Sequence, residues 1–208
     1  MALKTLHRIL AISFILFLLT RLTTIGSAQA LNSQLDSDRL LSLREFANQI
    51  KNNQGGELRG IYVPEILAAY VVQQPKGHNE FVSARQNTVT QFNLASQFGS
   101  TGLLAHNYLV GERFSLLKEN QIFYLVYGDG QISTFVVTDI LRYQALNPTS
   151  PSSEFIDLAT NDSLTASELF SKVYQRPGQV ILQTCIAAGN NSSWGRLFVI
   201  AKPYFLKP

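Results

Sequence analysis

Short apolar runs separated by turn-forming residues dominate the chain from residue 58 onward. The runs are rich in Val, Ile, Tyr and Phe, and Pro, Gly and Asn fill the breaks between them, which is typical of β-strands joined by turns. Two of the runs meet at Asp129-Gly130 and predict a hairpin. Many short strands with frequent turns predict a mainly β domain, either a closed barrel or a sandwich. The predicted strands lie in LRGIYVP (58–64), ILAAYVVQQ (66–74), GLLAHNYLV (102–110), IFYLVYG (122–128), STFVVTDILRY (133–143), QVILQTCIA (179–187) and GRLFVIAKPYF (195–205).

Apolar residues three and four positions apart predict helices in three other segments. The first lies within residues 31–56, where Asp36 or Ser37 would cap a helix that packs on the main domain. The second is VTQFNLASQF (89–98). The third is SLTASELFSKVY (163–174), in which Ser163 or Thr165 precedes Glu168 in the spacing of a capping box.

Residues 1–30 have the pattern of a secretory signal peptide. Lys4 and Arg8 precede the apolar run Ile9–Leu19, and Ala28-Gln-Ala30 follows as a cleavage signature. A retained signal anchor is the alternative, but a membrane span needs about 20 apolar residues and this run is shorter. The predicted organisation is a signal peptide or anchor at 1–30, a helix and linker at 31–56, and the main β domain at 57–208. The protein is therefore expected to be secreted or otherwise extracytoplasmic and associated with the cell surface, and membrane-anchored if the segment is retained.

The charge balance changes when residues 1–30 are set aside. They contain three of the 17 basic residues and none of the 14 acidic residues, so the remainder has 14 of each. A nucleic-acid-binding surface would need a basic patch or stripe, and no such run is present. We therefore expect no nucleic-acid partner.

Three residues stand where apolar runs begin or end. Cys185 is the only cysteine and ends one run, Arg196 begins the next, and His106 follows Ala105 at the end of an earlier run. A single cysteine in an exported protein is a buried thiol, an intermolecular link or a reactive group. An arginine within a predicted core strand needs a partner, either a carboxylate or a developing negative charge.

Together these residue types form a set suited to acyl transfer. A nearby cation converts a thiol into a strong nucleophile, a histidine can protonate a departing amine, and an arginine can stabilise an oxyanion. One cysteine with one histidine gives no zinc ligand cluster. The chain also has no phosphate-binding loop, dinucleotide glycine motif or G-x-S-x-G elbow. We expect no metal and no organic cofactor.

The same segments resemble the sortase family of cysteine transpeptidases (peptidase C60-like). Residues 181–185 (ILQTC) match the family's Thr-Leu-x-Thr-Cys motif except at the first position, and Arg196 follows in WGRLFVIA. His106 in LLAHN resembles the family's histidine segment, and residues 111–137 resemble its run into a hairpin. The similarity covers about residues 58–203.

The resemblance implies an eight-stranded β-barrel with short helices, and a hydrolase-class transpeptidase. Cys185 would be the nucleophile, His106 the general acid/base and Arg196 the stabiliser of substrate and oxyanion, with Thr184 and Trp194 lining the substrate cleft. Sortases cut Leu-Pro-x-Thr-Gly-type sorting signals at the C-terminus of exported proteins and transfer the acyl group to an amine on the cell wall or a pilin, or to water. They need no organic cofactor, although some bind calcium.

Two other hypotheses stay open from the sequence. A sortase-fold module could hold peptides without cleaving them. An exported β-rich adhesin or structural domain could bury Cys185 as an ordinary core residue. The second hypothesis predicts that His106 and Arg196 lie far apart.

Overall fold

The computed structural model describes residues 40–150 and 152–205 and is mainly β. The predicted signal peptide at 1–30 lies outside these residues. No helix among the described residues is long and apolar enough to cross a membrane. The elements are α2 (Leu43–Ile50), β1 (Leu58–Val63), β2 (Leu67–Gln73), β3 (Thr88–Phe92), α3 (Asn93–Ser96), β4 (Thr101–Leu104), the 3-10 helix η1 (Val110–Leu116), β5 (Ile122–Tyr127), β6 (Ile132–Ala145), β7 (Phe155–Asp157), β8 (Ser163–Leu164), α4 (Ala166–Tyr174), β9 (Val180–Ala188) and β10 (Asn191–Pro203).

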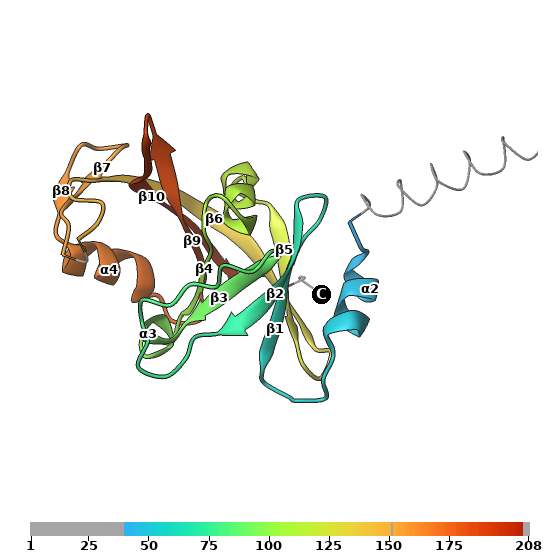
Figure 1. The fold of residues 1–208 in the computed structure, drawn as a ribbon. Helices are drawn as coiled ribbons and strands as arrows, with labels where there is room; N and C mark the ends of the chain where they lie inside the picture. Colours follow the sequence, from blue (N-terminus) through green and yellow to red (C-terminus); the bar gives the residue numbers. More distant parts are fainter. Residues whose placement is uncertain (1–39, 151, 206–208) are drawn as a thin grey trace, which may run out of the picture. The chain divides into compact units, whose positions relative to one another are not determined.

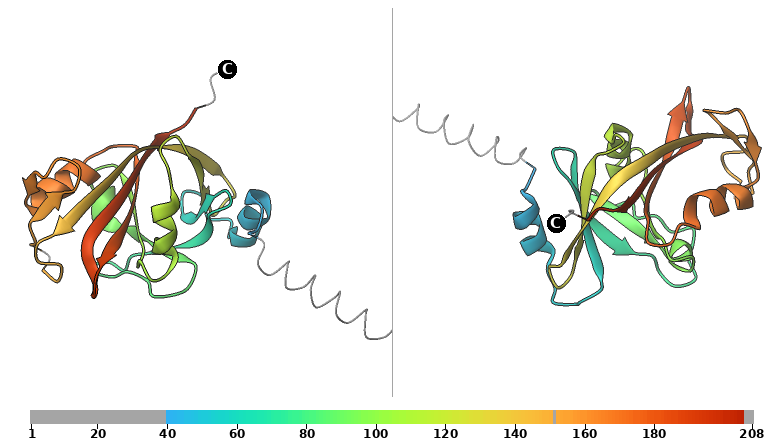
Figure 2. Two further views of the ribbon diagram at one scale, coloured as in Figure 1. Left: turned by 90° about the horizontal axis from the view of Figure 1, so that it is seen from above. Right: turned by 180° about the vertical axis from the view of Figure 1, so that it is seen from behind.

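The strands form a closed barrel, as predicted from the sequence. Their order is β10-β9-β4-β3-β2-β1-β5-β6, and pairing of β10 with β6 closes the ring of eight strands. The β2–β3 and β4–β9 pairs are parallel and the other pairs of the ring are antiparallel. Strands β7 and β8 extend the sheet beyond β6. The long strands β6, β9 and β10 run side by side from the barrel toward α4 (Figures 1 and 2).

Strand alternation divides the apolar residues between two cores. The barrel interior contains Val180, Leu182, Leu197 and Val199 among its fully buried residues. The alternate positions of the same strands point outward, where Ile181, Phe198 and Ile200 pack with residues of α4. Because side chains alternate across a strand, β9 is buried on both faces over residues 180–182 and β10 over residues 197–201.

The helix predictions were confirmed in two segments and wrong in part in the third. Helix α2 begins after Ser42, which forms a capping box with Glu45, whereas Asp36 and Ser37 lie outside the described residues. Helix α4 begins after Thr165, with the predicted partner Glu168. The segment 89–98 is helical only in α3, because its first residues pair with β2 and β4 as strand β3.

The predicted strand at 102–110 was also too long. Strand β4 ends at Leu104. The chain then turns through His106, whose carbonyl accepts hydrogen bonds from the amides of Leu109 (3.0 Å) and Gly111 (3.1 Å). Helix η1 follows, with Val110 and Phe114 buried in the barrel core. Tyr108, Leu109 and Val110 had been counted as strand because a short apolar run fits either structure.

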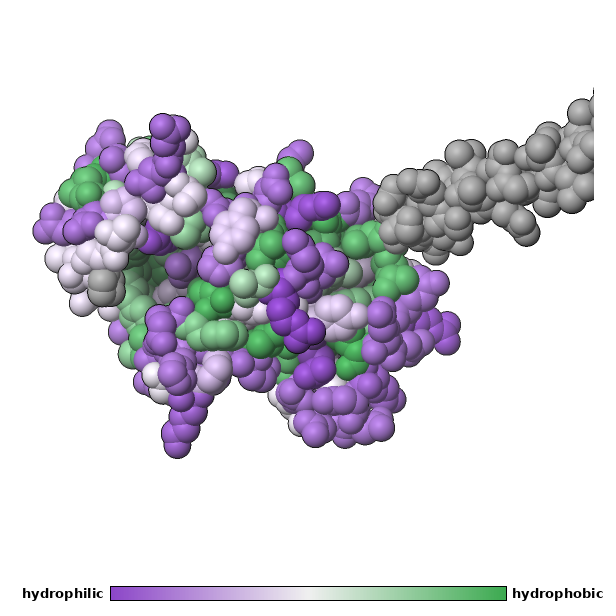
Figure 3. Space-filling model, viewed as in Figure 1, coloured by the Kyte–Doolittle hydropathy of each residue, from purple (hydrophilic) through white to green (hydrophobic). Residues whose placement is uncertain are grey.

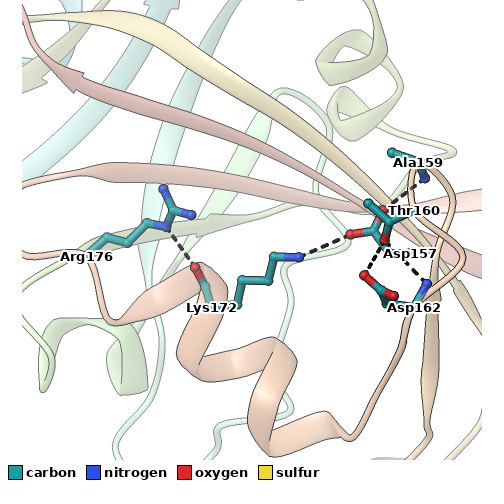
Figure 4. A network of polar contacts seen from close by, with 6 residues as sticks. All are labelled: Asp157, Ala159, Thr160, Asp162, Lys172 and Arg176. Carbon is teal, nitrogen blue, oxygen red and sulfur yellow. Dashed lines mark hydrogen bonds and ion pairs between the residues drawn. The ribbon is translucent and has the colours of Figure 1, made fainter.

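The segment between β6 and β9 forms an insert, defined as residues 146–150 and 152–179, which includes β7, β8 and α4. Lys172 of α4 contacts Asp157 of β7 at 3.1 Å, and Arg176 contacts Asp139 of β6 at 3.8 Å. Burial raises the pKa of Asp157, but the Ala159 amide and the Lys172 ammonium outweigh it and lower the pKa overall. Figure 4 shows this network between α4 and the β7 turn. The network fixes α4 against the outer face of the barrel.

Candidate active site

Cys185 and Arg196 lie directly opposite each other in the antiparallel β9–β10 pair. Opposed residues in such a pair have Cβ atoms about 4.5–5.5 Å apart and point to the same face. Gln183 and Phe198 form the next opposed pair on this face. Phe198 packs in the core outside the barrel, which we call the outer core, so the face is the outer one. Both Cys185 and Arg196 are partly exposed. Folding therefore brings the predicted thiol and guanidinium side by side.

His106 lies just beyond the strand that flanks β9 on its other side. Strand β4 runs parallel to β9 with Leu104 opposite Gln183, and the Ala105 amide donates to the Gln183 carbonyl at 3.1 Å. His106 follows Leu104 by two residues, just beyond the end of β4, as Cys185 follows Gln183 by two residues in β9. The three predicted residues therefore come from β9, β10 and the loop that follows β4. We call His106, Cys185 and Arg196 the outer row.

Contacts on both sides fix the loop that carries His106. The Asn107 side-chain amide donates to the carbonyl of Ser192 in the β9–β10 turn at 2.8 Å. The rings of His106 and Tyr108 stack at 5.0 Å between centroids. A Cβ atom on Gly111 would lie 2.6 Å from the His106 carbonyl oxygen and 2.5 Å from Thr184 Oγ1. Only glycine allows η1 to approach this closely, and that approach sets the path of the His106 loop.

The guanidinium of Arg196 is held by main-chain carbonyls. Its Nη1 donates to Ser193 and Gly195, both at 2.9 Å, and its Nη2 donates to Pro148 of the insert at 3.2 Å. The Nε–H group and the second Nη2–H group donate to no described residue. Arg196 therefore ties the insert to β10 and still has donors for a substrate oxygen.

An apolar groove adjoins Arg196 on the outer face. Figure 3 shows apolar side chains in the hollow beside α4. The groove has a volume of about 170 Å³. Burial raises the pKa of Tyr174, so its hydroxyl remains protonated and donates to Gln183 Oε1 at the base of the groove. We call this cavity the outer groove; it is lined by Phe92, Phe155, Ala166, Leu169, Phe170, Tyr174, Gln183, Arg196 and Phe198.

The two predicted substrate-binding residues lie elsewhere. Thr184 is 4% exposed and points to the opposite face of β9 from Cys185. Trp194 is partly buried in β10 and does not line the outer groove. Their predicted role stays a prediction. In the part of the chain that the structure describes, no cluster of three or more His, Cys, Asp and Glu side chains could hold a metal ion.

The sequence did not reveal the contribution of α4 to the outer groove. Phe92 of β3 and Phe155 of β7 line it, but four lining residues belong to α4. The missed signal was the spacing of Ala166, Leu169, Phe170 and Tyr174, which gives α4 one apolar face. That face forms a wall of the groove.

Several solved structures of sortases are similar to this chain. Sortase A from Corynebacterium diphtheriae has a TM-score of 0.47 and 16% identity, over 74% of this chain and 64% of that chain. Sortase C-1 from Actinomyces oris has a TM-score of 0.49 and 15% identity, over 88% and 99%. The pilus-related sortase C of Group B Streptococcus has a TM-score of 0.48 and 17% identity, over 80% and 76%. No family model and no curated protein matches the chain.

Proposed function

We propose that the protein is an exported sortase-type cysteine transpeptidase. The observation that supports this most strongly is the opposition of Cys185 and Arg196 in the β9–β10 pair, with His106 in the loop that follows β4, the neighbour of β9 on its other side. Nucleophilic catalysis needs a nucleophile, a group that moves the proton and a stabiliser of the developing charge. The row supplies one residue of each type.

The first half of the reaction would form a thioester. The Cys185 thiolate attacks the carbonyl carbon of a peptide bond, and the oxygen of the tetrahedral intermediate accepts a hydrogen bond from Arg196. The C–N bond then breaks, and protonated His106 gives its proton to the leaving amine. The acyl group remains on the sulfur.

The second half would transfer the acyl group. An amine or a water molecule attacks the thioester carbon, and neutral His106 takes the proton that the attacking atom loses. The C–S bond breaks and the thiolate is restored. The products are a new amide, or a free carboxylate if water attacks.

The outer groove would hold the acyl side of the substrate. Its aromatic and aliphatic lining suits apolar side chains, as in a Leu-Pro-x-Thr-Gly-type sorting signal, and it adjoins Arg196. The expected substrates are exported proteins with such a signal near their C-terminus. The expected acceptor is an amine on the cell wall or a pilin, and the expected location is the cell surface.

The test is mass spectrometry of the full chain after incubation with a fluorogenic Leu-Pro-x-Thr-Gly-type peptide. We expect an adduct on Cys185 with the mass of the acyl fragment, together with peptide cleavage. Cys185→Ala should abolish both. Arg196→Lys keeps the charge but loses the fork of donors, and cleavage should fall by about 100-fold. Cleavage that persists in Cys185→Ala would refute the thiol mechanism.

A peptide-binding module without catalysis is the second candidate. The three hydrogen bonds from Arg196 to main-chain carbonyls favour it, because they engage part of the guanidinium in structural contacts. This candidate predicts that the peptide binds wild type and Cys185→Ala equally, with no adduct in either. Fluorescence anisotropy of a labelled peptide, run beside the mass spectrometry, separates the two functions.

A further inference from the structure

The outer groove has a mostly apolar lining, and two of its residues bring nitrogen donors to it. They are Arg196 of β10 and Gln183 of β9. Gln183 precedes Cys185 by two residues, so both side chains point to the same face of β9. Gln183 was not among the residues predicted from the sequence to contact a substrate. Its surroundings nevertheless indicate what its side-chain amide recognises.

The Tyr174 hydroxyl determines which end of the Gln183 amide faces the groove. Tyr174 is 3% exposed, and its hydroxyl donates to Gln183 Oε1. Burial raises the pKa of Tyr174, so the hydroxyl keeps its proton. With the amide reversed, its nitrogen would face this hydroxyl, and the buried hydroxyl proton would have no acceptor among the described residues. Oε1 is therefore held toward Tyr174, and Nε2 is turned away from it.

The amide nitrogen of Gln183 has no partner in the described part of the chain. Gln183 is partly exposed, and Nε2 donates to no residue there, so only solvent can accept from it. Phe198, the residue opposed to Gln183 in β10, is apolar and offers no acceptor. A ligand that covers the groove would remove the solvent from this nitrogen. That costs free energy unless the ligand itself accepts a hydrogen bond.

The rest of the lining indicates what kind of acceptor the ligand brings. The rings of Phe92, Phe170 and Phe198 line the groove, and Phe92 contacts Tyr174 edge to face with 5.3 Å between centroids. Such walls suit apolar side chains, whereas a polar side chain would lose its hydration there. A peptide with apolar side chains still carries main-chain carbonyls, which need a donor when they are buried. A main-chain carbonyl is therefore the acceptor that fits this groove.

We infer that Gln183 binds a main-chain carbonyl of the acyl segment, and that Tyr174 is the positioning residue that keeps the amide nitrogen turned toward the peptide. The inference rests on the proposed function, because it takes the outer groove as the site of the acyl segment. Gln183 and Cys185 are separated by about 7 Å along β9. Carbonyls on one side of an extended peptide recur at the same spacing, every second residue.

The spacing identifies the carbonyl. If the Cys185 sulfur attacks the carbonyl carbon of residue n of the peptide, the Gln183 amide meets the carbonyl oxygen of residue n−2. In a Leu-Pro-x-Thr-Gly-type signal cut after threonine, that residue is the proline. Because successive carbonyls point to opposite sides, a peptide shifted by one residue would lose this hydrogen bond. Gln183 would thus help to select the peptide bond that reaches the sulfur.

The inference can be tested without catalysis, in the full chain with Cys185→Ala. The probes are a labelled Leu-Pro-x-Thr-Gly-type peptide and two analogues in which sulfur, a weaker acceptor, replaces one carbonyl oxygen, either at the proline or at residue x. Fluorescence anisotropy measures binding. We expect the analogue with sulfur at the proline to bind about fivefold more weakly than the parent peptide, as for one lost hydrogen bond. The analogue with sulfur at residue x should bind like the parent.

Variants of the groove identify the donor. Gln183→Leu should weaken the parent peptide about fivefold and abolish the difference between the parent and the proline analogue. Tyr174→Phe should weaken the parent peptide by a smaller factor, because the amide is then free to turn, and it should have no further effect in Gln183→Leu. Gln144→Leu is the matched control, because Gln144 is a partly buried glutamine of β6 that does not line the outer groove. It should leave all three affinities unchanged.

Several outcomes would overturn the inference. Equal binding of the parent and the proline analogue to Cys185→Ala would do so without any change in the groove, and so would the absence of peptide binding. Equal losses in Gln183→Leu and Gln144→Leu would show that the amide has no special role. A difference between the two peptides that persists in Gln183→Leu would assign the contact to another donor.

Failure of the inference is distinguishable from failure of the proposed function. If wild type forms the thioester but sulfur at the proline has no effect on binding, the contact is wrong and the transpeptidase stands. If binding depends on Gln183 as expected but no thioester forms, the transpeptidase is wrong, and Gln183 remains a contact of the peptide-binding module. If both occur, Gln183→Leu should raise the KM for thioester formation by about the factor lost in binding.

Discussion

The barrel and the insert contribute to the candidate site by different means. The barrel positions the outer row through backbone hydrogen bonds between strands. Cys185 and Arg196 are opposed in the β9–β10 pair, and β4, which pairs with β9, leads into His106. The insert supplies the α4 wall of the outer groove through side-chain packing of Leu169, Val173 and Tyr174 on the outer face of the barrel. Register is shared by every residue of a strand, whereas a side-chain contact can open alone. We therefore expect the insert to open at a lower free energy than the barrel.

The largest expected effect is on the barrel, with Leu182→Ala. Leu182 is fully buried in the barrel core, and truncation of such a leucine costs about 2–5 kcal/mol of the free energy of unfolding. The insert counterpart is Leu169→Ala, since Leu169 is 4% exposed in the outer core. Because the insert can open separately, the free energy of global unfolding should fall by less than about 2 kcal/mol. The α4 amides should exchange faster.

Urea denaturation and amide hydrogen exchange measure the two effects. Leu116→Ala is the control, because Leu116 is 54% exposed, and its effect should stay within about 0.5 kcal/mol. Equal losses of global stability in Leu182→Ala and Leu169→Ala would contradict the difference between barrel and insert, because they would show that the two regions unfold as one unit.

A smaller effect is expected from Lys172→Met, which removes the ammonium that contacts Asp157. The Asp157 side chain is 9% exposed and keeps the hydrogen bond from the Ala159 amide at 2.9 Å. The Lys172 side chain is 40% exposed, so solvent screens the pair, and we expect a loss of about 1–2 kcal/mol. Exchange of the α4 amides should report this loss, and the β9 amides should not change. Faster exchange in β9 would contradict a local effect.

The pH dependence of the insert follows from the same pair. The folded pKa of Asp157 is lowered, so its contribution is present above the unfolded pKa of about 3.9 and is lost as pH falls through the folded value. The Tyr143 hydroxyl raises the pKa of Lys172. Burial lowers this pKa and the Asp157 carboxylate raises it, so that the pKa is raised overall. That contribution is present below the unfolded pKa of about 10.4 and is lost as pH rises through the folded value.

The expected outcome is therefore a plateau of insert stability between these limits, with opening of α4 first in acid. Amide exchange, corrected for its intrinsic pH dependence, measures it. Lys172→Met should flatten the profile on the alkaline side and bring the acid-side loss to a higher pH, because the Asp157 pKa rises without its partner. An unchanged acid limb in Lys172→Met would show that another group controls the opening.

The sequence predicted most of the strands because strand periodicity and turn residues are local signals, and the choice of a barrel over a sandwich came from the family resemblance. The hairpin at Asp129-Gly130 and the cap at Thr165 were placed correctly for that reason. The strand β3 was taken for a helix, because its pairing with β2 and β4 is set by residues distant in sequence. Local propensity is overridden by such pairing.

The site was predicted in part. His106 and Cys185 stand at the end of an apolar run and Arg196 at the start of one, and the β9–β10 register brings Cys185 and Arg196 opposite each other. Sequence could not show that Arg142 lines a cavity with Thr184. That relation depends on the β6–β10–β9 register. The left-handed backbone at Asn120 (φ 67°) was not predicted from the sequence either.

The smallest expected effects come from the two capping boxes, which form a matched pair. Thr165 caps α4 of the insert, and Ser42 caps α2, which packs over Gly60 of β1. Thr165→Ala and Ser42→Ala should each cost their helix about 1 kcal/mol, but only α4 lines the outer groove. Thr165→Ala should therefore weaken binding of a sorting-signal peptide to the Cys185→Ala chain by about fivefold at most, and Ser42→Ala should leave it unchanged. Equal effects on binding would mean that the caps act through global stability, and the groove would then not depend on the insert as a separate unit.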